Sequence, residues 1–243
     1  MKKRRLVFFT GAGISAESGI STFRDNNGLW ENNKIEEICN ISTWKKNRKI
    51  VFDFYNKRRS QLKEVLPNKI HFFISDIQKK YSKELDIFII TQNIDDLLEK
   101  ANTKKVLHVH GNLKQMHCTA CNNKWDIGYE EVNEETIRCP KCNSNKGVKP
   151  NVVFFGEIAP KYREMKKILN SLDNEDMLIV MGTMGNVVSI NNYANYLNSY
   201  KILNNLEESP YINEKYFNKV FYRKGSEAIK DIENEIKNYF KLK

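Results

Sequence analysis

The strongest constraint on the fold is a glycine-rich turn that directly follows an apolar run near the start of the chain. Residues 6–9 have the length and the aromatic and β-branched content of a buried strand. Gly11, Gly13 and Ala16 then form the pattern G-x-G-x-x-A at the start of an expected helix. In a dinucleotide-binding unit these residues allow a tight turn, close approach to a pyrophosphate at the helix N-terminus, and close helix–strand packing. The pattern predicts a nucleotide site; the alternative is a core strand followed by a turn that binds nothing.

The segment after this turn argues against an ordinary dehydrogenase. In that fold a second strand ends, about 20 residues on, in an acidic residue that binds the adenosine ribose. Here residues 22–30 are polar and rich in turn formers, with Phe23 and Trp30 but no apolar run. A nucleotide site in this chain would therefore have to be completed by something other than the usual second strand.

Length and charge limit the classes of protein that the chain can belong to. Its 243 residues suffice for one large domain with smaller insertions. There is no run of about 18 apolar residues, so we expect no membrane contact, and the basic start is followed by too short an apolar run for a signal peptide, which predicts a cytoplasmic protein. The formal net charge of +10 would suit nucleic acid or the steering of anionic ligands. Because the lysines are scattered, we favour ligand steering over binding to nucleic acid.

Four of the five cysteines form two C-x-x-C pairs with 17 residues between them. This spacing is typical of a zinc site with four thiolate ligands, here Cys118, Cys121, Cys139 and Cys142. Disulfides are the alternative, but in a reducing compartment such pairs more often hold metal. Four thiolates leave no open coordination position, so we expect one structural zinc ion whose binding supplies the folding free energy of residues 112–149.

Strand and helix patterns alternate along most of the chain. Apolar runs of strand length occupy residues 85–91, 106–111, 150–157, 176–182, 199–205 and 217–222, and helical patterns occupy residues 35–66, 70–81, 161–172 and 226–240. This alternation predicts an α/β fold: a Rossmann-like parallel sheet with helices on both faces, plus a small zinc-binding and helical domain. We assign residues 1–30, 68–111 and 150–243 to the large NAD-binding domain, 31–67 to a helical insertion and 112–149 to a zinc-ribbon insertion.

Polar residues follow two of the expected strands where ligands of open α/β sheets bind. Gln92, Asn93 and Asp95 come directly after residues 85–91, at the expected carboxyl edge of the sheet. The alternative for this run is a helix cap. His108 and His110 end the next strand, and their shared parity would place both on one side of it.

Several motifs occur together and in a fixed order. They are the run from Gly11 to Ile20, Phe23-Arg24, Gly28-Leu29-Trp30, residues 91–95, His110-Gly111, the two C-x-x-C pairs, residues 152–157, Gly182-Thr183 and residues 205–207. With these motifs the chain resembles the sirtuins from about residue 5 to residue 240. The resemblance implies an enzyme that uses NAD to remove acyl groups from lysine side chains of proteins. Its products would be nicotinamide, the free lysine and O-acyl-ADP-ribose.

The resemblance also implies which residues bind NAD. Backbone at the two glycine turns would cradle the phosphates, residues 92–95 would line the nicotinamide and its ribose, and residues 205–207 would hold the adenosine ribose. Met184 stands where the family usually has serine. The full set is Gly11, Ala12, Gly13, Ile14, Ser15, Phe23, Arg24, Trp30, Gln92, Asn93, Ile94, Asp95, Gly182, Thr183, Met184, Asn205, Leu206, Glu207 and Gly225.

His110 and Asn93 are the catalytic residues that the resemblance implies. An imidazole with an ordinary pKa near 6.5 is a usable base at neutral pH, and His110 would activate a ribose hydroxyl. His108 competes for this role, but only His110 precedes a glycine as the family requires. We therefore expect a structural role for His108.

Two segments are expected to bind the acylated lysine. Val153, Phe154, Phe155, Gly156 and Glu157 would pair with the substrate backbone by strand addition, or form a simple edge strand. Tyr55 and Arg58 lie three residues apart on one helix face, where a phenol and a guanidinium can hold a carboxylate. This pair resembles that of class III sirtuins, which accept succinyl- and malonyl-lysine as well as acetyl-lysine, and Cys39 would line the same pocket. The alternative is the solvated face of a basic helix.

Two rival functions stay open at this point. The same cofactor site would also suit transfer of ADP-ribose to a protein. A zinc ribbon on a nucleotide-sensing fold would instead bind DNA or RNA, which requires basic and aromatic residues near the cysteines. The insertion shows no clear cluster of that kind.

Overall fold

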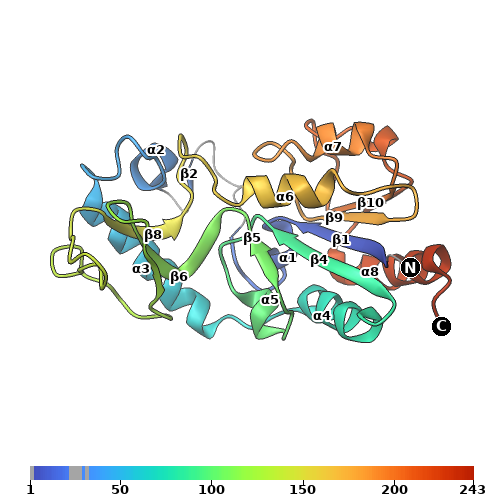
Figure 1. The fold of residues 1–243 in the computed structure, drawn as a ribbon, viewed down its shortest axis with the longest axis horizontal. Helices are drawn as coiled ribbons and strands as arrows, with labels where there is room; N and C mark the ends of the chain where they lie inside the picture. Colours follow the sequence, from blue (N-terminus) through green and yellow to red (C-terminus); the bar gives the residue numbers. More distant parts are fainter. Residues whose placement is uncertain (1–2, 22–28, 31–32) are drawn as a thin grey trace.

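The centre of the molecule is a six-stranded sheet, seen in a computed structural model that describes residues 3–21, 29–30 and 33–243. All of its neighbouring strands are parallel, in the order β11-β10-β9-β1-β4-β5 (Figure 1). The strands are β1 (Arg4–Thr10), β4 (Leu85–Thr91), β5 (Val106–His108), β9 (Met177–Met181), β10 (Tyr200–Asn205) and β11 (Lys219–Tyr222). This confirms the α/β class and the Rossmann-like parallel sheet.

The apolar run of β1 is buried on both faces of the sheet. Leu6 and Phe8 belong to one apolar cluster, and Val7 and Phe9 belong to another on the opposite face. The first cluster is covered by α4 (Lys69–Tyr81) and α8 (Gly225–Phe240), and the second by α6 (Tyr162–Leu169) and α7 (Ile190–Tyr196) (Figure 1). Burial on two faces explains why the strand reads as continuously apolar rather than alternating.

At β1 the chain switches from building one side of the sheet to building the other, and this switch point determines where a ligand can bind. From β1 the chain continues to β4 and β5 on one side, and β9, β10 and β11 lie on the other. In open α/β sheets ligands bind outside the carboxyl ends of the strands at such a switch point. The turns that follow β1 and β9 therefore meet at the expected binding edge.

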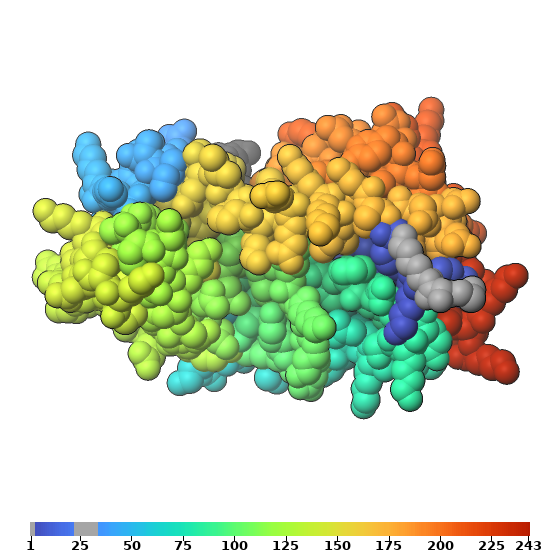
Figure 2. Space-filling view, in the orientation of Figure 1, coloured from blue at the N-terminus to red at the C-terminus, as the bar shows by residue number. Residues whose placement is uncertain are grey.

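A smaller part of the molecule lies beyond β5 and has its own apolar core. A three-stranded antiparallel sheet packs against helices from an earlier stretch of the chain (Figure 1). Its elements are α2 (Ile35–Ile38), α3 (Arg48–Glu64), β6 (Gly111–Cys118), β7 (Lys124–Asp126) and β8 (Val148–Val152). Figure 2 shows this part at one end of an elongated molecule and the C-terminal helix at the other. Two apolar clusters thus lie on the two faces of the main sheet, and the third lies in this smaller part.

The expected helix over residues 35–66 is interrupted, and this expectation was wrong in detail. Residues 39–47 form turns between α2 and α3. Within these turns the Asn40 side-chain oxygen accepts hydrogen bonds from the Ser42 N–H (2.9 Å) and the Ser42 hydroxyl (2.7 Å). A side chain that bonds nearby backbone in this way competes with helix formation.

The strand expected over residues 150–157 begins earlier and ends earlier. β8 ends at Val152, and the following residues form a loop. The backbone of Phe155 pairs there with the small domain: its N–H donates to the Cys39 carbonyl, and its carbonyl accepts from the Ile41 N–H. The loop thus joins the two parts of the molecule beside the carboxyl edge of the main sheet.

The remaining elements are short. They are α1 (Gly13–Ala16), α5 (Leu97–Lys100), the 3-10 helix η1 (Glu214–Tyr216) and a hairpin of β2 (Leu29–Trp30) and β3 (Asn33–Lys34). Among the described residues, no helix combines the length and the apolar character that crossing a bilayer requires. This finding agrees with the lack of a long apolar run in the sequence.

Candidate active site and metal centre

A cavity of about 1250 Å³ lies at the carboxyl ends of β1, β4 and β9, between the sheet and the small domain. Most of the site residues expected from the sequence line it. They are Gly11, Ala12, Gly13, Ser15, Gln92, Asn93, Ile94, Asp95, His110, Gly182, Thr183, Met184 and Glu207 from the sheet side, and Arg58, Val153, Phe154, Phe155, Gly156 and Glu157 from the other.

The glycine turns after β1 and β9 pack directly on each other. The Gly11 N–H donates to the Met181 carbonyl (3.0 Å), and the Gly13 N–H donates to the Gly182 carbonyl (2.8 Å). A Cβ on Gly13 would lie 2.7 Å from the Gly182 Cα, and one on Gly182, at φ +64°, would lie 2.6 Å from the Ile14 nitrogen. Gly13 and Gly182 must be glycine because the two backbones are in direct contact.

The short helix after the turn differs from the expectation that its N–H groups face an anion. The N–H groups of Gly13, Ile14 and Ser15 donate to the carbonyls of Gly182, Gly11 and Ala12. They are engaged because α1 is a single turn that closes on itself and on the neighbouring glycine turn. What the turn presents to the cavity is its close-packed backbone surface.

A buried polar network ties α1 to the end of β4. The Ser15 hydroxyl donates to Asp95 Oδ2 (3.0 Å) and accepts from Asn93 Nδ2 (3.1 Å), and it lies 3.4 Å from His71 Nε2. The Asn68 N–H donates to His71 Nδ1, which places the ring proton on Nε2. Burial lowers the pKa of His71 to about 4 and raises that of Asp95. The network therefore fixes Asn93 and Asp95 at the cavity wall.

His108 and His110 lie in opposite electrostatic environments, although they are only two residues apart. His108 Nδ1 donates to the Asn93 carbonyl (2.8 Å), and its Nε2 lies 2.7 Å from a Glu99 carboxylate oxygen. Both partners can only accept, so both ring nitrogens carry protons. Burial opposes this charge, but Glu99 and the Asn93 carbonyl raise the pKa of His108 above its ordinary value. A histidine held as a cation is no general base.

His110 has the arrangement that a general base needs. Its Nδ1 donates to the Gln92 carbonyl (3.1 Å), so its Nε2 carries a lone pair. Burial lowers the pKa of His110, with the Gln92 carbonyl working in the opposite direction, which favours the neutral ring. His110 lines the main cavity and His108 a second one, so the expectation that both lie on one side was wrong. The reason is that β5 ends at His108 and the chain turns at Val109 and His110.

Some expected cofactor residues lie behind the cavity wall. The Asn205 side chain accepts from the Thr183 N–H (3.0 Å) and donates to the Thr183 carbonyl (2.9 Å), which holds the second glycine turn in shape. Ile14 is buried, the Leu206 side chain is exposed, and Gly225 packs against Ile70. Phe23 and Arg24 lie outside the described residues, and of Trp30 only the backbone is described.

At the other end of the cavity the wall is built from side chains of the small domain. Arg58 lines the cavity, together with Cys39 and Phe154. Tyr55 is completely buried behind them, and its ring stacks on Phe154 (centroids 6.0 Å apart). The two residues expected to act as a pair thus lie at different depths, with Arg58 nearer the open space.

The loop after β8 is held by a buried lysine. Lys149 Nζ donates to the Val152 carbonyl (2.6 Å) and to Glu157 Oε2 (3.0 Å), and it lies 4.0 Å from the centre of the Phe154 ring. The same carboxylate oxygen accepts the Phe154 N–H (2.9 Å). Glu157 therefore closes the loop on itself and fixes the ring of Phe154 at the cavity.

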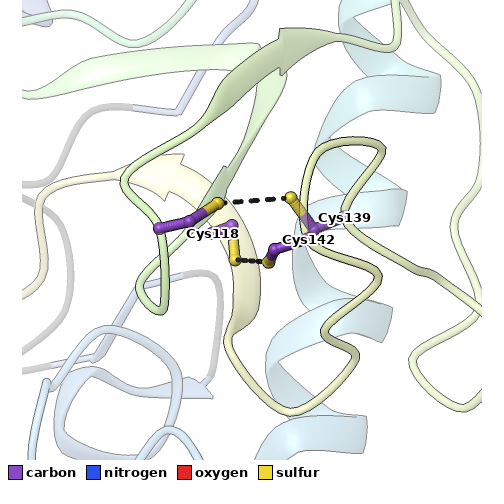
Figure 3. Close-up of side chains that lie close together, drawn as sticks. Cys118, Cys139 and Cys142 are labelled. Atoms are coloured by element: carbon purple, nitrogen blue, oxygen red, sulfur yellow. Dashed lines mark hydrogen bonds between the residues drawn. The ribbon is translucent and has the colours of Figure 1, made fainter.

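The four expected zinc ligands converge in the small domain. Figure 3 shows this cluster, with Cys118, Cys139 and Cys142 labelled. Their sulfur atoms all lie within 4.8 Å of one another, with 3.6 Å between Cys118 and Cys142 and between Cys121 and Cys139. Tetrahedral zinc with bonds of about 2.3 Å holds its sulfurs about 3.8 Å apart, whereas a disulfide needs about 2.05 Å. The cluster therefore fits one zinc ion and excludes disulfides.

Local backbone explains why the cysteines are ready to bind metal. Each C-x-x-C pair is followed by an asparagine at positive φ, Asn122 (58°) and Asn143 (57°). Their N–H groups donate to the carbonyls of Cys118 and Cys139 and close two similar turns. Asparagine tolerates this left-handed conformation better than most residues. The two turns present two sulfurs each to one point.

Comparison with known proteins agrees with this arrangement. The profile of the Sir2 family matches residues 11–189, which is most of the chain. The chain belongs to the Sir2 family. It is 42% identical to an NAD-dependent protein deacylase of Helicobacter hepaticus, over 97% of this chain and 98% of that protein. It is 40% identical to a protein of the same description from Campylobacter jejuni, over 98% of each.

Solved structures of Sir2 proteins share the fold. One is a Sir2 homolog–NAD complex, which is 30% identical, has a TM-score of 0.81 and matches 98% of this chain and 91% of that one. Another contains a deacetylated peptide with 3′-O-acetyl ADP-ribose; it is 26% identical, has a TM-score of 0.77 and matches 96% of this chain and 94% of that one. The sirtuin resemblance of the sequence is thus confirmed at the level of family and fold.

The structure of this Sir2 protein adds wall residues that the sequence did not single out. Tyr162, Arg163 and Lys166 of α6 line the cavity, and so does Gln61 of α3. Tyr162 Oη lies 2.8 Å from His110 Nε2. The sequence signal for these residues is weak, because α6 shows only an amphipathic pattern with no motif. The position of α6 at the cavity depends on the path of the loop that connects β8 to it.

Proposed function

We propose that this protein removes acyl groups from lysine side chains of proteins in an NAD-dependent reaction. The single observation that carries the proposal is the position of His110, which lines the same cavity as the glycine turns and the loop after β8 while its Nδ1 contacts the Gln92 carbonyl. Deacylase relatives that match nearly the whole chain, and Sir2 structures with NAD or with a peptide and an acetylated ADP-ribose, support it.

The residues of the chain divide the chemical work between them. When bound, NAD supplies a ribose carbon that the acyl oxygen attacks as nicotinamide leaves. His110 Nε2 then accepts the proton of a ribose hydroxyl, and the Gln92 carbonyl steadies the imidazolium through Nδ1. Asn93, held by Ser15, and Asp95 orient the ribose and the carboxamide. The deprotonated ribose oxygen would then bond to the acyl carbon, and the C–N bond to lysine would break with consumption of one water. The products of this scheme are nicotinamide, the free lysine and O-acyl-ADP-ribose.

Acidic acyl groups form the second part of the proposal. Arg58 lines the cavity beside Cys39 and Phe154, so its side chain borders the space that an acyl chain would enter. It would hold a succinyl or malonyl carboxylate through charge-assisted hydrogen bonds. Tyr55 is completely buried behind this wall, so its phenol would add one more bond only if the wall rearranged when the acyl chain bound. Acetyl-lysine lacks a carboxylate and would depend on the apolar wall alone.

The test is a panel of acetyl, succinyl, malonyl and long-chain acyl peptides, each incubated with and without NAD. We expect deacylated peptide and nicotinamide in equal amounts, and only when NAD is present. The variant His110→Tyr should lose turnover while its zinc content, measured by emission spectrometry, stays at one ion per chain. Retained turnover would remove His110 from the mechanism.

Mass spectrometry of the peptides and of the enzyme distinguishes the rival reaction. Attachment of ADP-ribose to either, without loss of the acyl group, would favour transfer of ADP-ribose to protein over deacylation. Acylated proteins are the proposed partners, and a cytoplasmic location without binding to nucleic acid stays a prediction from the sequence.

A further inference from the structure

Tyr162 makes a contact with His110 that the proposed reaction does not use. Its hydroxyl lies 2.8 Å from His110 Nε2, and the two ring centroids are 5.8 Å apart with the planes tilted by 45°. Tyr162 is the first residue of α6 and is half-buried. The helix is anchored to the sheet by Met165 and Leu169, which are completely buried. The tyrosine is therefore presented to His110 from a fixed support.

The protons of this contact can be assigned from its partners. The Gln92 carbonyl can only accept, so His110 Nδ1 carries the ring proton and Nε2 has a lone pair. The Tyr162 O–H must then be the donor to Nε2. A ring nitrogen has one lone pair in the ring plane, so Nε2 cannot accept at the same time from Tyr162 and from a ribose hydroxyl. The base is occupied in this structure.

We propose that Tyr162 is a positioning residue for the general base His110. Its hydroxyl donates to the Nε2 lone pair, and so caps it, until a substrate hydroxyl takes its place. The inference rests on the proposed function of His110. In the exchange one hydrogen bond breaks and another forms, while the Tyr162 O–H bond stays intact. The proton that later moves to Nε2 comes from the substrate hydroxyl alone.

The cap should leave a measurable trace in the acid–base behaviour of His110. Burial lowers the pKa of His110. A donor to the lone pair stabilises the neutral ring, so we expect the contact with Tyr162 to lower this pKa further. Removal of the donor should therefore raise the pKa. The charged groups that line the same cavity are Arg58, Asp95, Glu157, Arg163, Lys166 and Glu207, and the charged neighbour on the strand itself is His108. None of them changes in the variant below.

The deciding experiment is an NMR titration of the histidine rings in the unliganded protein, which contains four histidines. In Tyr162→Phe we expect the pKa of His110 to rise by about 0.5–1 unit, the size of one ordinary hydrogen bond. The matched control is Tyr196→Phe on α7, whose hydroxyl bonds Asn170 Oδ1 away from the cavity. It should leave the pKa of His110 unchanged. Tyr162→Leu, which also lacks the donor, should reproduce the shift if the phenylalanine variant folds poorly.

Kinetics on an acyl peptide give the second readout. The acid limb of kcat/KM should move to higher pH by the same amount as the pKa, with kcat on the plateau within about twofold. An unchanged pKa of His110 would show that the contact does not form and would overturn the proposal. A fall of about 100-fold in plateau kcat would instead make Tyr162 a proton carrier, which also overturns the capping role. Because the titration needs no turnover, it remains decisive even if the protein is no deacylase.

Discussion

At one end of the main cavity two backbone turns pack against each other, and at the other end the wall is built from side chains. The glycine end consists of the turns at Gly11 to Gly13 and at Gly182, which touch each other through main-chain atoms. The acyl end consists of Cys39, Arg58 and Phe154, carried by the small domain and the loop after β8. Backbone walls are fixed by the fold, whereas side-chain walls can change without altering it. We infer that the glycine end is common to all substrates and that the acyl end selects among them.

Substitution of Gly182 should have the largest effect, because it breaks the glycine end for every substrate. A Cβ there would lie 2.6–2.9 Å from the backbone of Gly13 and Ile14. We expect Gly182→Ala to lower turnover of every acyl peptide by more than about 100-fold, since displacing a cofactor by 1 Å has effects of that size. Binding of ADP-ribose, measured by calorimetry, should be lost as well.

A substitution at Gly128 distinguishes the effect of steric overlap from the effect of backbone strain at a positive φ. Gly128 also has a positive φ (58°), but a Cβ there has no neighbour within 4 Å. Gly128→Ala should cost only about 1–2 kcal/mol of stability and leave binding of ADP-ribose intact. Equal effects of the two substitutions would mean that strain, rather than contact between the turns, requires glycine at position 182.

Loss of a zinc ligand should impair the acyl end of the cavity and spare the glycine end. The acyl end rests on the small domain, whose cysteine cluster would supply much of its folding free energy when metal binds. We expect Cys142→Ser to lower zinc content and to reduce deacylation by more than about 100-fold. ADP-ribose should still bind within about threefold of the original affinity, because the glycine end contains no residue of residues 112–149.

The matched control for this variant is the fifth cysteine. Cys39 lies in the acyl end rather than in the cluster, so Cys39→Ser should keep the zinc while altering turnover. If Cys142→Ser instead lost ADP-ribose binding and deacylation equally, the two ends could not be regarded as independent.

The glycine end could be predicted from the sequence because short-range rules determine it. An apolar run buried on both faces identifies β1, and the turn residues that follow it are visible in the chain. The zinc cluster was equally accessible, because its spacing is local to each cysteine pair. In both cases the residues that carry the function are neighbours in the sequence.

The acyl end depends on packing between distant segments, and the sequence predicted it less well. Helical spacing placed Tyr55 and Arg58 on one face, but the ring of Phe154, about a hundred residues later, stacks on Tyr55, and Tyr55 is completely buried. The cap on His110 was missed for the same reason, since Tyr162 reaches it only through the loop that Lys149 and Glu157 close. No local pattern records such contacts.

Arg58→Met should sharpen the comparison by changing the acyl end for one class of substrate only. Loss of a charge that binds a carboxylate in a desolvated site costs about 2 kcal/mol or more, which corresponds to about 30-fold. We therefore expect kcat/KM on succinyl- and malonyl-lysine peptides to fall by at least that factor. Activity on the acetyl peptide should change by less than about threefold, because methionine preserves the apolar wall.

Lys57→Met is the matched control, because it removes one positive charge from the neighbouring, exposed position of the same helix. If general attraction of acidic substrates to a basic protein explained the preference, the two variants would behave alike and high salt would abolish it. A direct contact instead predicts a loss specific to Arg58 that persists in salt. If Arg58→Met lowered kcat/KM equally on acetyl and succinyl peptides, Arg58 would only support the cavity wall. The apolar side chains of the acyl end would then select the acyl group.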